Sequence, residues 1–205
     1  IFSYEESSNQ LIRNMRSIAI DLERWTKKGL LRIHSSRPTL QGLEQHLVQM
    51  YEAVRQFQPS LVVVDPISNL TMHTDDAGLK PMLMRLIDFM KKSDITGVYT
   101  NLVGNEGATL AETQLGVSSL MDVWLMLSNV AVEGERTRAL QIIKSRGMPH
   151  SNLVREFVFS DRGVEIVDVF LDAGRPLTGR RRVGAQAANA ARRPPSAQVA
   201  RRRKA

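Results

Sequence analysis

The chain contains no cysteine among its 205 residues. This absence excludes disulfide bonds, thiolate metal sites and cysteine nucleophiles together. No apolar run approaches the ~18 residues that a membrane-spanning helix requires, and the first residues carry neither a basic leader nor a small-residue cleavage site. We therefore see no signal peptide, and because the lack of cysteine is compatible with a cytosolic protein, we expect a cytoplasmic location.

A phosphate-binding loop is also missing. Such a loop reads Gly-x-x-x-x-Gly-Lys-Ser/Thr between a strand and a helix, and its backbone N–H groups and lysine cradle a triphosphate. No such run occurs between residues 1 and 205, so these residues cannot cradle a triphosphate by that route. Because Ile1 to Tyr4 already read as a strand, the sequence opens in the middle of a pattern, and we expect the chain to be a fragment.

Acidic residues are absent from residues 173–205, which contain ten of the chain's 28 Lys and Arg residues. Residues 1–172 therefore contain 18 basic and 21 acidic residues, and the net charge of +7 for the whole chain arises from the tail. This distribution argues against a uniformly basic nucleic-acid-binding domain. The Arg, Ala, Pro, Gly and Gln composition predicts a disordered tail. The tail could attract phosphates without specificity, solubilise the chain, or anchor it near anionic lipid. Alternatively, the tail could result from an altered reading frame.

Residues 1–172 alternate strand and helix patterns, which predicts one α/β domain with a mostly parallel sheet. We expect strands at 1–4, 30–33, 61–65 and 97–101. Apolar residues at helical spacing predict a helix through Leu11, Met15, Ile18 and Leu22, one from Thr39 to Phe57, and one through Leu79, Leu83, Leu86, Ile87 and Met90. The run from Leu61 to Val64 is continuously apolar, so we expect it to be buried on both faces at the centre of the sheet.

The pattern changes after residue 122. Four short strand patterns follow one another with turns and no helical pattern between them, at 123–127, 138–144, 155–159 and 164–167. This succession predicts antiparallel hairpins that extend the parallel sheet.

Acidic residues end two of the expected strands. Asp65 follows four apolar residues, and an acid at that position holds Mg²⁺ in many nucleotide-binding α/β proteins, whose ligands collect at the carboxyl ends of strands. A loop or helix cap is the alternative use of such an acid. Glu5 and Glu6 end the first strand, where adjacent carboxylates can polarise an attacking water or hydroxyl or stabilise the positive end of the next helix.

Four segments of the chain resemble the KaiC family of bacterial circadian-clock ATPases and autokinases. They are Phe2-Ser3-Tyr4-Glu5-Glu6-Ser7, the strand ending at Asp65, Val98-Tyr99-Thr100-Asn101, and Arg138-Ala139-Leu140-Gln141-Ile142-Ile143-Lys144-Ser145-Arg146-Gly147. Their order and spacing match over roughly residues 1–170, and they are more similar to the family's second, C-terminal ATPase domain than to its first. The resemblance implies a RecA-like α/β fold, ATP and Mg²⁺ as cofactors, and a ring-shaped hexamer with ATP between subunits.

The resemblance also implies roles for individual residues. Glu5 and Glu6 correspond to the family's adjacent glutamates, one of which is the general base, and Asp65 corresponds to the acid that holds Mg²⁺. Arg138, Lys144 and Arg146 correspond to basic residues that reach the nucleotide of the neighbouring subunit.

Simple strand geometry agrees with the last of these roles. Alternate residues of a strand share one face, so Arg138, Lys144 and Arg146 would point the same way. A cationic row of this kind can stabilise charge on a transferring phosphoryl group. A solvated hairpin face is the alternative reading of the same pattern.

Ser118 and Ser119 correspond to the family's adjacent Ser-Thr phosphorylation pair, and Thr113 corresponds to a nearby threonine implicated in the same chemistry. The second hydroxyl is serine here, which retains a nucleophilic oxygen. The family's acid after that threonine is Gln114 here, and Val117 precedes the pair, so we expect the local hydrogen bonding to differ.

Two other functions remain open at this stage. The first is a nucleic-acid motor or recombination ATPase, which shares the fold. The arginine clusters of the tail support this function, but the excess of acidic residues in residues 1–172 does not favour it. A non-catalytic interaction module is the second alternative, because the phosphate-binding loop is missing. For a clock-like protein we expect a homo-oligomer and signalling-protein partners.

Overall fold

The computed structural model describes residues 1–71, 76–102, 119–132, 135–160, 162–167, 170–172 and 175–177. These residues form two compact units. The first unit combines residues 1–124 with 144–149 and 159–164, and the second contains residues 125–143, 150–158 and the segment from 165 onward. None of the helices in the described part of the chain is long and apolar enough to cross a lipid bilayer.

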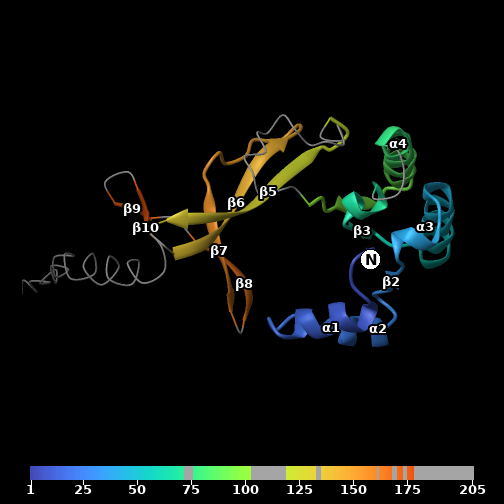
Figure 1. Ribbon diagram of the computed structural model, residues 1–205, viewed down its shortest axis with the longest axis horizontal. Coiled ribbons are helices and arrows are strands. Elements are labelled where there is room, and N and C mark those ends of the chain that lie inside the picture. The colour runs from blue at the N-terminus through green and yellow to red at the C-terminus, as the bar shows by residue number, and fades with distance from the viewer. Residues whose placement is uncertain are drawn as a thin grey trace, which may run out of the picture. The chain divides into compact units, whose positions relative to one another are not determined.

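The first unit contains a four-stranded parallel sheet, of which Figure 1 labels strands β2 and β3. Its strands are β1 (Phe2–Ser3), β2 (His34–Ser35), β3 (Leu61–Asp65) and β4 (Thr96–Tyr99), in the order β2-β1-β3-β4. In the register of the sheet, Ser3 lies opposite both Ser35 and Asp65. The carboxyl ends of β1, β2 and β3 therefore meet at one edge of the sheet.

Two expectations about these strands are wrong. The strand predicted at 30–33 lies at His34–Ser35 instead, because the backbone N–H groups of Leu30 and Leu31 donate to the carbonyl of Trp25 and close the preceding helix. Strand β3 is central, as predicted, but it is not buried on both faces. Val62 and Val64 are buried, whereas Leu61 is 52% exposed.

Four α-helices accompany the sheet in the described residues: α1 (Ser8–Arg16), α2 (Leu22–Lys27), α3 (Leu43–Phe57) and α4 (Asp76–Lys92). Two short 3₁₀ turns, η1 (Pro38–Leu40) and η2 (Ile67–Thr71), precede α3 and α4. The helix predicted from Thr39 to Phe57 begins at Leu43 instead, because Pro38–Leu40 forms a separate 3₁₀ turn.

The single helix predicted through Leu11 and Leu22 is two helices. Helix α1 ends at Arg16, and Ala19 adopts a positive φ of 61°, which an α-helix cannot accommodate. The Asp21 side chain then accepts a hydrogen bond from the Arg24 backbone and begins α2.

The core of the first unit lies between the sheet and helices α3 and α4. The α4 residues predicted from helical spacing are all buried, and Leu83 and Leu86 are fully enclosed. Met50 of α3 and Val64 of β3 are fully buried in the same cluster. Burying this much apolar surface stabilises the unit and fixes the strand ends on which the polar residues lie.

A second sheet contains β5 (Val123–Val132), β6 (Glu135–Ser145), β7 (Arg155–Ser160) and β8 (Gly163–Val167), in that order. β6 and β7 are antiparallel, with Arg138 opposite Phe157. Strands β9 (Phe170–Asp172) and β10 (Arg175–Leu177) form a further antiparallel pair. Of these two strands, β10 lies in the segment predicted as a tail, residues 173–205. A parallel sheet with helices followed by antiparallel strands confirms the predicted RecA-like α/β class.

Helix α1 begins directly after Glu5 and Glu6 because Ser7 and Gln10 form a capping box. The Gln10 backbone N–H donates to Ser7 Oγ, and the Ser7 backbone N–H donates to Gln10 Oε1 at 3.1 Å. Replacing Ser7 with Ala should cost about 1 kcal/mol of local stability. We expect amide hydrogen exchange at residues 8–11 to accelerate about fivefold. The matched control is Asn9→Ala in the same exposed turn, and equal exchange in both variants would contradict the cap's role.

Candidate functional site

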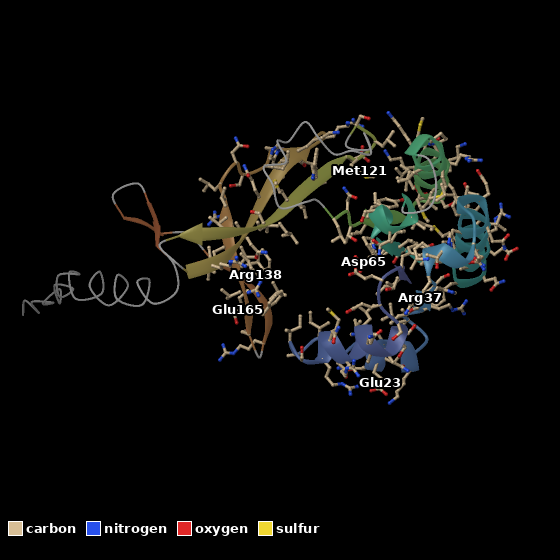
Figure 2. All side chains as sticks on the ribbon, in the orientation of Figure 1. Glu23, Arg37, Asp65, Met121, Arg138 and Glu165 are labelled. Carbon is tan, nitrogen blue, oxygen red and sulfur yellow. The ribbon has the colours of Figure 1, made fainter. Side chains whose placement is uncertain are left out.

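The candidate site lies at the carboxyl edge of the parallel sheet, where Asp65 ends β3 (Figure 2). The Asp65 side chain is half-buried, and its Oδ1 accepts a hydrogen bond from the Thr100 hydroxyl. The Thr100 backbone N–H donates to the Val64 carbonyl at 3.1 Å, which holds this hydroxyl in place. No hydrogen bond within the described residues engages Asp65 Oδ2, so one carboxylate oxygen is oriented and the other is available.

The end of β1 is tied to the same edge by its backbone. The Tyr4 N–H donates to the Asp65 carbonyl at 2.7 Å, and the Tyr4 carbonyl accepts from the Asn69 side chain at 3.3 Å. Tyr4 itself is buried, and that burial raises the pKa of its phenol well above the ordinary value. Glu5 and Glu6 therefore follow a residue that is fixed against the carboxyl end of β3.

The two adjacent glutamates have different surroundings. Glu6 is half-buried, and its Oε1 accepts a hydrogen bond from Asn14 Nδ2 at 2.7 Å. Ser3 also fixes the Glu6 backbone, because its hydroxyl donates to the Glu6 carbonyl at 2.8 Å and accepts from the Glu6 N–H. Glu5 is exposed and makes no hydrogen bond or ion pair within the described part of the chain. The structure thus holds Glu6 in place and leaves the Glu5 carboxylate available for chemistry.

These residues fit the metal end of a nucleotide site. Mg²⁺ is usually held in such sites by one or two carboxylates together with phosphate oxygens and waters, and Asp65 offers one oriented carboxylate. No group of three or more His, Asp or Glu side chains that could hold a metal alone occurs among the described residues. Asp65 can therefore contribute one ligand to a metal that phosphate oxygens and waters also coordinate.

Arg146 follows β6 and is held by residues of its own unit. Its Nη1 lies 3.1 Å from Asp122 Oδ1, and its Nη2 donates to the Ser119 carbonyl at 3.3 Å. The other Asp122 oxygen, Oδ2, lies 2.8 Å from Lys91 Nζ of α4. The hydrogen bond from Lys91, with the charges of Lys91 and Arg146, lowers the pKa of Asp122 below its ordinary value.

The other predicted site residues fall in different places. Lys144 is half-buried on β6 in the first unit, whereas Arg138 is exposed on β6 and belongs to the second unit. Ser119 is exposed in the turn before β5. Ser118 and Thr113 lie outside the described residues.

Several polar residues at this edge were not predicted as site residues. Thr100 orients Asp65, and Asn14 binds Glu6. The buried Oδ1 atom of Asn101 has no hydrogen-bond partner among the described residues. The sequence did carry a signal for Thr100 and Asn101, because polar residues that directly follow a parallel strand lie at the ligand-binding edge. Lys91 and Asp122 carried no such signal.

Comparison with known proteins gives a consistent result. The family model described as "ATPase: KaiC" matches residues 1–169. The chain is 46% identical over 180 residues to "Circadian clock protein KaiC2" of Synechocystis sp., covering 87% of this chain and 32% of that protein. It is 34% identical over 179 residues to "Circadian clock oscillator protein KaiC" of Picosynechococcus sp., covering 87% and 35%. The chain thus spans about a third of the length of these relatives.

Proposed function

The chain belongs to the KaiC family of ATPases, and from this premise we propose that the intact protein hydrolyses ATP and phosphorylates its own hydroxyl residues. It acts in the cytoplasm as a ring-shaped hexamer, with ATP bound between subunits. The phosphate-binding loop that the reaction needs is not among residues 1–205. In this proposal, the loop is supplied by another part of the same protein.

The observation that carries the proposal is the meeting of Asp65 and the Glu5–Glu6 pair at one edge of the sheet. Asp65 would hold Mg²⁺, which supplies charge neutralisation at the phosphates when bound. Thr100 keeps the Asp65 carboxylate in one orientation. Glu5, which has no partner within the described residues, accepts the proton of the attacking water or hydroxyl.

Basic residues from the next subunit complete the site in this proposal. Arg146, Lys144 and Arg138 would approach the phosphates of the neighbouring subunit's ATP and stabilise the charge that develops during transfer. Such an arrangement makes turnover depend on assembly, because an isolated subunit would lack these cations.

The phosphate acceptors in this proposal are Ser118 and Ser119, with Thr113 taking part in the same chemistry. Ser119 is exposed, so its hydroxyl is accessible to a phosphate donor. Transfer moves the γ-phosphoryl group from ATP to the serine oxygen. ADP leaves, and the serine proton passes to Glu5.

Phosphopeptide mass spectrometry of the full-length protein after incubation with Mg²⁺ and ATP tests this function. We expect phosphate on Ser118 or Ser119, and we expect it to be absent from a Glu5→Gln, Glu6→Gln double variant. ATP hydrolysis without any phosphorylated residue would reduce the protein to an ATPase. If DNA then stimulated that hydrolysis, the nucleic-acid-dependent ATPase would replace the autokinase.

A further inference from the structure

Three charged residues from separate elements of the first unit form a bridge. Lys91 lies in the last turn of α4, Asp122 directly precedes β5, and Arg146 directly follows β6. Each oxygen of the Asp122 carboxylate contacts one cation, at 2.8 Å for Lys91 and 3.1 Å for Arg146. The Arg146 backbone N–H also donates to the Asp122 carbonyl at 2.8 Å, so backbone and side chain are held together.

The bridge occupies only part of the Arg146 guanidinium. An arginine side chain has five N–H donors in a rigid plane. One Arg146 donor is directed at Asp122 and one at the Ser119 carbonyl. The plane of the guanidinium is thereby fixed by two contacts of its own subunit, while its remaining donors can reach another molecule. About half of the Arg146 side chain, 56%, is exposed.

We propose that Asp122 is a positioning residue that holds Arg146 in the orientation needed to contact the neighbouring subunit's nucleotide, with Lys91 anchoring the carboxylate. This inference rests on the proposed function, because it takes the contact of Arg146 with that nucleotide as its premise. An unrestrained arginine occupies many rotamers, so fixing one of them in advance reduces the entropy lost on contact with the phosphate.

Two simpler roles fit the same residues less well. A pocket of about 210 Å³ includes two of the bridge residues in its lining. The lining residues are Met84, Ile87, Asp88, Lys91, Ser119, Leu120 and Arg146. The two cations of the pocket, Lys91 and Arg146, are balanced by the carboxylates of Asp88 and Asp122, so the pocket has no excess positive charge with which to bind a free anion.

A purely stabilising role for the bridge is also weak. Exposed ion pairs contribute little to stability, and the side chains of Lys91, Asp122 and Arg146 are all about half exposed.

A double-mutant cycle in the full-length protein tests the proposal. The variants are Asp122→Asn, Arg146→Met and the combination, and the measurement is kcat/KM for ATP hydrolysis. Asp122→Asn alone should lower kcat/KM about tenfold, and it should cause no further loss once Arg146 is Met. Asp88→Asn is the matched control, because Asp88 lines the same pocket, is exposed and makes no ion pair within the described residues. We expect Asp88→Asn to keep the parent kcat/KM.

The outcomes separate this inference from the function on which it rests. An equal loss from Asp122→Asn in both backgrounds, or no loss at all, would overturn the positioning role and leave the function of Arg146 intact. If Arg146→Met itself retained the parent kcat/KM, the contact of Arg146 with the nucleotide would be wrong, and the positioning role would be wrong with it.

A second measurement reads the bridge directly and does not depend on activity. Phenylglyoxal modifies arginine side chains, and mass spectrometry of the nucleotide-free protein gives the rate at Arg146. Asp122→Asn should raise this rate severalfold, while Asp122→Glu, which keeps the carboxylate, should leave it closer to that of the parent. An unchanged rate in Asp122→Asn would show that Asp122 does not hold Arg146.

Discussion

Replacing Asp65 with Asn will abolish Mg²⁺-dependent ATP hydrolysis and leave the fold in place. The substitution keeps the size of the side chain and an oxygen that can accept from Thr100, but it removes the negative charge that a divalent cation requires. Charge stabilisation by a bound metal contributes several kcal/mol to such reactions, so we expect kcat to fall at least ~100-fold. Steady-state ATPase assays of the full-length protein, with circular dichroism to verify folding, measure this effect.

A graded series separates the charge of Asp65 from its orientation. Thr100→Val removes the hydroxyl that donates to Asp65 Oδ1 but leaves the carboxylate ionised, so we expect a loss of about tenfold. Raising the Mg²⁺ concentration should partly rescue Thr100→Val and should not rescue Asp65→Asn. Parent-level hydrolysis in Asp65→Asn would contradict the assignment of Asp65 as the metal ligand.

The position of Asp65 at the sheet edge could be predicted because its signal is local. A short apolar run followed by an acid gives both the strand and the edge at which the acid lies, and the structure places Asp65 at the carboxyl end of a central strand. Helix α4 was equally predictable, because Leu79, Leu83, Leu86 and Met90 recur at helical spacing and all lie in the core. In both cases the information lies within one element.

The features that could not be predicted depend on contacts between distant residues. Asn14 binds Glu6 because the helix that begins after Ser7 brings Asn14 within hydrogen-bond distance of the Glu6 side chain, and nothing in the sequence near Glu6 indicates that partner. The bridge around Asp122 joins a residue of α4 to the residue before β5 and the residue after β6, so it exists only once the fold is formed.

The shift of β2 has a similar cause. The apolar residues Leu30 to Ile33 have strand-like composition, but the close of α2 uses the N–H groups of Leu30 and Leu31. A backbone donor that is committed to a helix end cannot also pair in a sheet. The next residues, His34 and Ser35, therefore form the strand, even though their side chains are exposed.

The two glutamates will respond differently to the loss of charge. Glu5→Gln should lower kcat for ATP hydrolysis about 10²–10⁴-fold, the range expected when a general base is removed. Glu6→Gln should lower it less than about tenfold, because the glutamine oxygen can still accept the hydrogen bond that Asn14 donates to Glu6. Single-turnover hydrolysis by the two single variants and the double variant measures the difference.

Asn14→Ala is the control that connects this result to the structure. It removes the partner of Glu6 without changing either carboxylate, so it should resemble Glu6→Gln and not Glu5→Gln. If Glu6→Gln proved the more damaging change, the base would be the half-buried carboxylate, and Asn14 would be holding it in its reactive orientation. Asn14→Ala would then lose activity as well. The combined pattern of the variants therefore identifies the proton acceptor. If Glu5 is the base, Glu6→Gln and Asn14→Ala are both mild, whereas if Glu6 is the base, Glu5→Gln is the mild variant.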